Sequence, residues 1–189
     1  LVNYYDESVT AMSLLNDIED KFEDVLSDKY KEKLQRLKAE ELFYVGTGDG
    51  MSASAGESPK VFDEVIRPEM EKALSFFDFT DVSSDEQAIN YSLYARILYE
   101  LQRYDDAEKY AEKAKQKVNL HWGEYSPVTE RVYRSNYALY RFLDLNKAAD
   151  YAYLAHKVNF NVGNYFGDHN KGFYQLNLSL IVYSLLYQG

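Results

Sequence analysis

The sequence LYELQRYDDA at residues 98–107 has a counterpart, LYRFLDLNKA, at residues 139–148. A tyrosine and two more small residues follow each block: Tyr110, Ala111 and Ala114 after the first, and Tyr151, Ala152 and Ala155 after the second. The alanines recur with an offset of 41 residues. Small residues at positions i, i+4 and i+7 share one helical face, where they let a neighbouring helix approach closely. The two blocks therefore predict helical hairpins that bury their apolar faces against one another.

Residues 88–114 resemble a tetratricopeptide repeat (TPR). Tyr91, Tyr94 and Leu98 resemble its first-helix core positions, and Tyr104 resembles its turn aromatic. The alanines at 107, 111 and 114 resemble the small positions of its second helix. The 41-residue offset is similar to that of the kinesin-light-chain type of TPR, and the resemblance covers residues 84–187.

The linkers also resemble the kinesin-light-chain type, in which Gly-acid-His-Pro precedes a helix that begins near Asn-Leu-Ala. The stretches similar to the linker are GEYSP at 123–127 and GDHN at 167–170. The stretches similar to the helix motif are NYA at 136–138 and NLS at 177–179. Asn170 stands where the family has proline.

The resemblance implies an all-α fold, a TPR-like stack of antiparallel helical hairpins (an α-solenoid) with about eight helices. We expect an N-terminal helical hairpin over 1–45, a flexible Gly/Ser loop over 46–58, and TPR-like helical repeats over 59–189 in one contiguous stack. Residues 1–80 fit either further degenerate repeats or an unrelated cap. The expected helices cover 8–26, 28–45, 59–77, 86–102, 104–119, 127–143, 145–161 and 171–187. Pro68 is expected to kink the third helix or to split it.

Apolar residues at spacings of three and four predict the inward faces of the first two helices. In the first helix these residues are Val9, Met12, Leu15, Ile18, Phe22, Val25 and Leu26. In the second they are Tyr30, Leu34, Leu37, Leu42 and Phe43. Lys31 and Lys33 are expected on the solvent side of the second helix.

The net charge of −10 argues against a nucleic-acid partner, because phosphate binding needs a basic patch. A membrane partner is not expected either. No apolar stretch reaches the ~18 residues of a membrane-spanning helix, and the sequence has no cluster of Lys or Arg that would bind anionic lipid. The absence of cysteine excludes disulfides and thiolate metal sites. It leaves the compartment unknown, with the cytoplasm favoured. The chain begins at Leu1, so we expect it to be a piece of a longer protein.

No motif in the chain indicates an enzyme, a cofactor or a metal. The glycine-rich GTGDG at 46–50 follows a helix and lacks the Gly-Lys-Ser/Thr that cradles phosphate. The three histidines, His121, His156 and His169, lack metal-ligand spacing. The acidic residues of 17–24 suit a solvated helix face, and acid–base catalysis needs a desolvated carboxyl group.

The resemblance implies that the first helix of each hairpin lines an inner groove. Asn136 and Asn177 occupy the family's asparagine position, where a side-chain amide can pair with a peptide backbone. Arginine and tyrosine are frequent at binding hot spots. The predicted partner-binding residues are Arg96, Arg134, Asn136, Tyr140, Arg141, Tyr174 and Asn177. The alternative for each asparagine is that it ties adjacent helices together.

The predicted function is a non-catalytic scaffold that binds a protein or peptide partner within a larger protein or complex. One alternative is a regulatory sensor that binds a small peptide signal and controls an attached effector. Another is a structural oligomerisation module that self-associates through the apolar last helix, 171–187.

Overall fold

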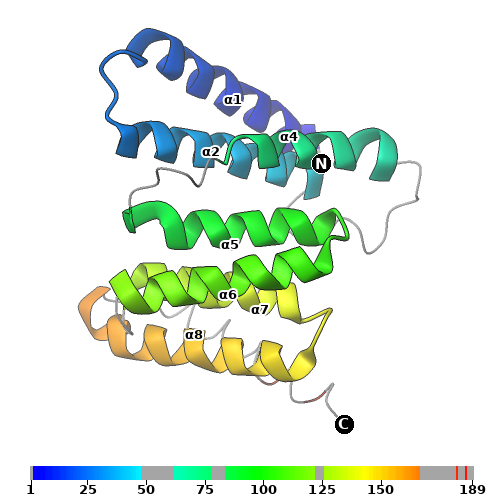
Figure 1. Ribbon diagram of the computed structural model, residues 1–189, viewed down its shortest axis with the longest axis vertical. Helices are drawn as coiled ribbons and strands as arrows, with labels where there is room; N and C mark the ends of the chain where they lie inside the picture. Colours follow the sequence, from blue (N-terminus) through cyan, green and yellow to red (C-terminus); the bar gives the residue numbers. More distant parts are fainter. Residues whose placement is uncertain are drawn as a thin grey trace.

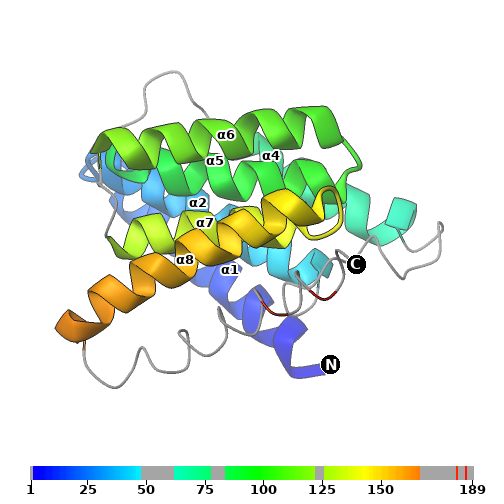
Figure 2. The same cartoon turned by 90° about the horizontal axis from the view of Figure 1, so that it is seen from below.

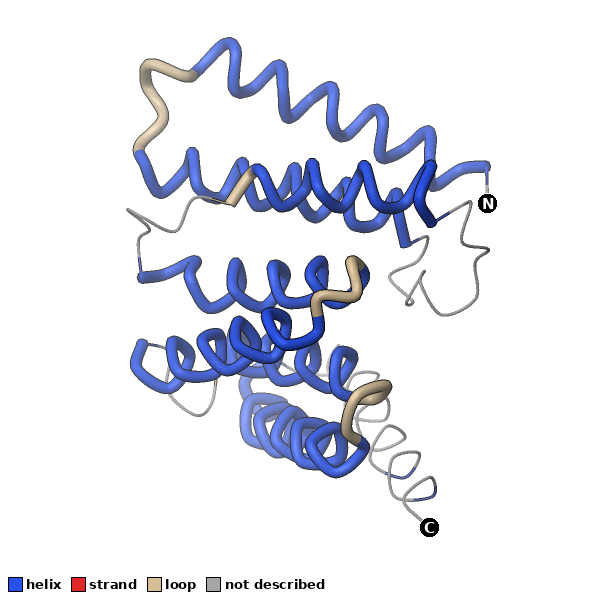
Figure 3. Tube along the Cα trace, turned by 45° about the vertical axis from the view of Figure 1, so that its right-hand side comes forward, coloured by secondary structure: helices blue, strands red, loops and turns tan. Residues whose placement is uncertain are grey.

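The computed structural model describes residues 2–47, 62–77, 84–121 and 126–166, together with 182 and 186. These residues form an all-α fold without a strand, as expected (Figures 1 and 3). The described part contains seven α-helices and one π-helical segment: α1 Val2–Phe22, α2 Asp28–Thr47, η1 Phe62–Ile66, α4 Arg67–Ser75, α5 Ser84–Glu100, α6 Tyr104–His121, α7 Pro127–Tyr140 and α8 Leu145–Phe166. The expected loop at 46–58 and last helix at 171–187 lie almost wholly outside the described residues, although 182 and 186 are helical.

The helices lie across the long axis of the molecule, with α1 near one end and α8 near the other (Figure 1). Helix α1 packs along α2, α5 packs along α6, and α7 packs along α8. Helix α2 also packs against η1 and α4. Further contacts of α5 with α2 and with α7 make α5 the central helix, so α2, α5 and α7 form a connected row (Figures 1 and 2).

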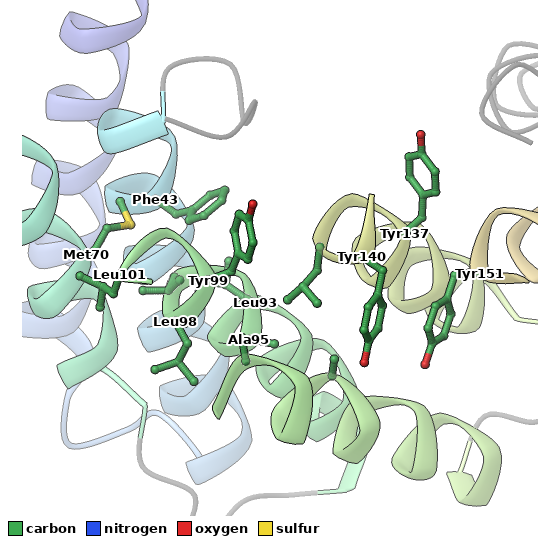
Figure 4. Packing of buried hydrophobic residues seen from close by; sticks show 14 of the residues in the cluster. Phe43, Met70, Leu93, Ala95, Leu98, Tyr99, Leu101, Tyr137, Tyr140 and Tyr151 are labelled. Atoms are coloured by element: carbon green, nitrogen blue, oxygen red, sulfur yellow. The ribbon is translucent and has the colours of Figure 1, made fainter. Parts of the chain in front are cut away.

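The two repeated alanine faces are buried between these helices. Ala107, Ala111 and Ala114 of α6 and Ala148 and Ala152 of α8 have no exposed surface, and Ala155 is 1% exposed. Larger side chains pack around them, from Phe43 of α2 and Met70 of α4 to Tyr140 and Tyr151 (Figure 4). The predicted role of these small residues in close helix packing is consistent with this burial.

The turn between α5 and α6 contains a left-handed residue. Gln102 has a φ of 61°, a conformation that favours glycine. The amide of Gln102 donates to the Tyr99 carbonyl at 2.9 Å, and the amide of Arg103 donates to the Leu98 carbonyl at 2.9 Å. This pair of bonds is a Schellman motif, which satisfies the last carbonyl groups of α5.

Helices α7 and α8 begin at 127 and 145, as predicted, because side chains cap both. The Ser126 hydroxyl accepts a bond of 3.0 Å from the Thr129 amide, and Pro127 occupies the first turn of α7. Asp144 accepts bonds from the amides of Asn146 and Lys147 at 3.0 and 3.2 Å. Ser126 and Asp144 each lie immediately before the first residue of the helix that they cap.

The prediction for the inward face of α1 is only partly correct. Met12 packs against the core, and Leu15 and Leu26 are half-buried, but Ile18, Phe22 and Val25 are exposed. Helix α1 makes its extensive described contacts with α2 alone, so it buries one narrow face. Val9 lies outside the side chains that the structure describes.

The prediction for α2 was correct for Leu34, Leu42 and Phe43, which are buried. Leu37 is half-buried, and Lys31 and Lys33 are exposed as expected. Tyr30 is 61% exposed, so its predicted inward position was wrong. It lies in the first turn of α2, at the far end from the buried Leu42 and Phe43.

Pro68 marks a change of helix type. The chain is π-helical over Phe62–Ile66 and α-helical from Arg67, so Pro68 lies in the first turn of α4. A proline in a first turn needs no intrahelical amide bond. The expected division of the 59–77 span therefore occurs just before the proline.

Candidate functional site

Arginine is concentrated in the row formed by α2, α5 and α7. Of the seven arginines of the chain, five lie in these helices or at the C-cap of α7: Arg36, Arg96, Arg131, Arg134 and Arg141. Helices α6 and α8 carry lysines and no arginine. In a chain with a net charge of −10, we take these five residues, the arginine set, as the candidate site. A guanidinium group suits carboxylate recognition, because its planar fork can donate two parallel bonds.

Arg131 connects α7 to α2. Its guanidinium group donates to Oε1 of Glu40, and Arg36 donates to the same oxygen at 2.9 Å. The Arg36 and Glu40 side chains are 6% and 14% exposed, whereas the Arg131 side chain is 45% exposed. Glu40 is therefore held between two arginines, and the outer part of Arg131 faces solvent.

Arg134 lies three residues after Arg131 on α7, so the two side chains are neighbours on the helix surface. Its Nε atom is 3.5 Å from an oxygen of Glu130, whose side chain is 11% exposed, whereas the Arg134 side chain is 33% exposed. Two partly exposed arginine side chains on one side of α7 thus pair with two largely buried carboxylates.

The other two predicted arginines contact aromatic rings. The guanidinium carbon of Arg96 lies 4.5 Å from the centre of the Phe43 ring, which joins α5 to α2. The guanidinium carbon of Arg141 lies 4.4 Å from the Phe142 ring. Arg141 is ten residues beyond Arg131, about 15 Å along a helix, so the arginine set is not one tight cluster.

Two other predicted site residues are interior residues. Asn136 is 1% exposed, and its amide donates to the Ala111 carbonyl of α6 at 3.2 Å. Tyr140 has no exposed surface, and its ring stacks on that of Tyr151 with centroids 5.4 Å apart. A partner cannot reach either side chain without separating the helices. Asn136 therefore ties α7 to α6, which was the alternative to groove binding.

The remaining predicted residues, Tyr174 and Asn177, lie outside the described residues. Arg36 and Arg131 were not predicted. The signal for them was the concentration of arginine on α2, α5 and α7, which the repeat pattern does not include.

A second cluster of charged and polar residues joins α6, α7 and α8. We call Glu108, Glu112, Tyr140, Lys147 and Tyr151 the phenol–carboxylate cluster. The Tyr151 hydroxyl donates to Glu112 at 3.0 Å, and Lys147 donates to Glu108 at 2.8 Å. Lys147 also lies 4.8 Å from the centre of the Tyr140 ring. Figure 4 shows the rings of Tyr140 and Tyr151 side by side, with their hydroxyls on the same side.

The environment of this cluster keeps both phenols protonated. Burial, and then the nearby Glu108 and Glu112, raise the pKa of Tyr140 far above its usual value. Burial and Glu112 raise the pKa of Tyr151 in the same direction. The hydrogen bond to Glu108 raises the pKa of Lys147. At neutral pH the phenols are donors rather than nucleophiles or bases, and the cluster holds three helices together.

Within the described ranges, no group of three or more His, Asp or Glu side chains is arranged to hold a metal ion. No helix in that part of the chain is long and apolar enough to cross a bilayer. Comparisons of the chain with protein-family models, curated proteins and solved structures found no match.

Proposed function

We propose that the chain is a non-catalytic module that binds an acidic segment of a protein or peptide partner, on a TPR-like stack of helical hairpins. The observation that carries the proposal is the pair of partly exposed arginine side chains on α7, Arg131 and Arg134, in a chain with a net charge of −10. The succession of packed pairs, α1 with α2, α5 with α6 and α7 with α8, supports the TPR-like part of the proposal, because TPR hairpins pack against one another in series.

The partner's carboxylates would bind first at Arg131, the more exposed of the two arginines. A guanidinium group has five N–H donors, and Glu40 occupies only part of those of Arg131. Glu40 and Glu130 orient the arginines, so binding loses little side-chain entropy. Arg96, already ordered against Phe43, extends the surface toward α5.

The test is a titration of the full chain with fluorescein-labelled peptides of about 15 residues, measured by fluorescence anisotropy. One peptide is rich in Glu, Asp and Leu, and its twin has Lys in place of every acidic residue. We expect the acidic peptide to bind despite the chain's net charge of −10. Arg131→Gln/Arg134→Gln should weaken that binding by about tenfold or more, since charge-assisted bonds each contribute ~1.5–3 kcal/mol.

Lys31→Gln/Lys33→Gln is the matched control, because it removes the same charge from exposed positions on α2. Circular dichroism of both variants verifies that the helices persist. Equal affinity of the two double variants for the acidic peptide would contradict the proposal, as would tighter binding of the lysine twin.

A further inference from the structure

Helix α1 carries a second apolar face that is open to solvent. Its residues, which we call the α1 stripe, are Leu14, Ile18, Phe22 and Val25, with exposed fractions of 59%, 41%, 49% and 77%. Their spacings of four, four and three place them along one side of the helix and the turn that follows it. Single exposed apolar residues are ordinary, but four in a row on one helix mark an interaction surface.

The contact of α1 with α2 leaves this stripe open. Glu19 faces α2 and binds Lys38 at 2.5 Å, and it also accepts a bond from Gln35. The Lys38 bond holds the pKa of Glu19 below its usual value, so this carboxyl group is ionised at neutral pH. Met12 packs against the core on the same side. Figure 1 shows α1 as the outermost helix at its end of the molecule.

The exposed charges around the stripe are mainly acidic. Asp17, Asp20, Glu23 and Asp24 are exposed, and the single cation among residues 10–26, Lys21, lies 3.4 Å from Asp17. A second copy of the chain would bring two such acidic helices together, and like charges facing across an interface oppose association. Charge complementarity therefore favours a basic occupant.

We propose that the α1 stripe docks an amphipathic helix of a partner protein whose apolar face is bordered by Lys or Arg. Apolar side chains at helical spacing on the partner pack between Leu14, Ile18 and Phe22. Its cations lie beside Asp17 and Asp24, which set the orientation and accelerate the encounter. This surface is separate from Arg131 and Arg134 and selects the opposite charge, so each proposal can fail without the other.

The test titrates the full chain with three labelled peptides of about 18 residues, or five helical turns. The first combines Leu, Ala and Lys so that all leucines share one helical face. The second has the same composition in scrambled order, and the third has Glu in place of Lys. We expect the first peptide to bind about tenfold more tightly than either of the others, and to weaken as salt rises.

Ile18→Ser/Phe22→Ser should weaken binding of the first peptide by about tenfold, because it removes the centre of the stripe. Leu14→Ser alone, at a more exposed site, should weaken it less. Tyr153→Ser is the matched control, since Tyr153 is 58% exposed on α8. Far-ultraviolet circular dichroism verifies that each variant is folded.

Equal binding of the scrambled peptide would show charge attraction alone and overturn the proposal. No effect of the stripe variants would do the same. Sedimentation velocity tests the alternative that a second copy of the chain binds the α1 stripe. A concentration-dependent dimer that is lost in Ile18→Ser/Phe22→Ser would support that alternative and overturn the proposal.

Discussion

Helices α5 to α8 and helix α1 use similar apolar patterns with different results. In α5 and α7, apolar residues are buried on several sides, because α5 contacts α2, α4, α6 and α7, and α7 contacts α5, α6 and α8. Helix α1 has one extensive neighbour, α2, and its apolar residues Leu14, Ile18 and Phe22 remain exposed. The difference teaches that periodicity identifies a helix, whereas the number of its neighbours decides how much of it is buried.

The same substitution made in both regions, Leu→Ala, tests this difference in burial most directly. Leu98→Ala on α5 removes a side chain with no exposed surface, and Leu14→Ala removes one that is 59% exposed. We expect Leu98→Ala to lower the free energy of unfolding by about 2–5 kcal/mol through the lost burial and the cavity. Leu14→Ala should change it by less than about 0.5 kcal/mol.

Urea denaturation followed by circular dichroism measures both values. A similar loss in the two variants would mean that the α1 stripe is covered within the chain. That result would also remove the basis for docking a partner there.

A smaller difference between the two regions should appear in the free energy of unfolding at alkaline pH. The folded pKa values of Tyr140 and Tyr151 are raised above the ordinary value of 10.0, so only the unfolded state releases these protons near pH 10. Their contribution to stability is therefore intact below about pH 10 and is lost as the pH rises above it. Each tyrosine adds up to about 1.4 kcal/mol of destabilisation per pH unit there.

Urea unfolding between about pH 9 and pH 11 reveals the slope. Tyr140→Phe/Tyr151→Phe should make the decline shallower than in the unmodified chain, whatever its stability at neutral pH. Tyr30→Phe, at an exposed site on α2, is the control and should keep the original slope. An unchanged slope in the double variant would show that these phenols ionise freely in the folded chain.

The smallest expected effect is a gain in stability at the turn between α5 and α6. Gln102 holds a φ of 61°, which costs about 1 kcal/mol for a residue with a Cβ atom. Gln102→Gly should raise the free energy of unfolding by up to about 0.6 kcal/mol, after the larger entropy of the unfolded glycine is subtracted. Gln102→Ala should give no gain.

Thermal unfolding of the three chains compares these values. A lower midpoint for Gln102→Gly would show that the glutamine side chain, rather than its backbone conformation, stabilises the turn.

Helices α5 to α8 could be predicted because their signals are local. Pro127 and Asp144 mark the starts of α7 and α8, and the alanines of α6 and α8 mark their buried faces. The inward side of α1 could not be predicted, because its buried apolar residues lie next to its exposed ones on the helix surface. Only the contact with α2 shows which of them are buried. The TPR-like identity and the binding function remain predictions.

The candidate site was harder to predict from the sequence than the helices were. The resemblance placed Asn136 and Tyr140 in a groove by residue type, but their burial follows from the contact of α7 with α6 and α8. Arg134 is partly exposed, and its role in partner binding stays a prediction. Arg131 was not selected, because its contact with Glu40 joins residues that are remote in sequence.

The ion pair of Arg131 and Glu40 joins residues that are 91 positions apart. Most other described contacts join neighbouring helices, so they can form as soon as two adjacent segments meet. We expect this pair to form late in folding, after α5 has packed against both α2 and α7, because the chain segment between its partners is long. Interactions that are absent from the folding transition state slow unfolding without accelerating folding. We therefore expect the pair to lengthen the lifetime of the folded row formed by α2, α5 and α7 more than it changes the folding rate.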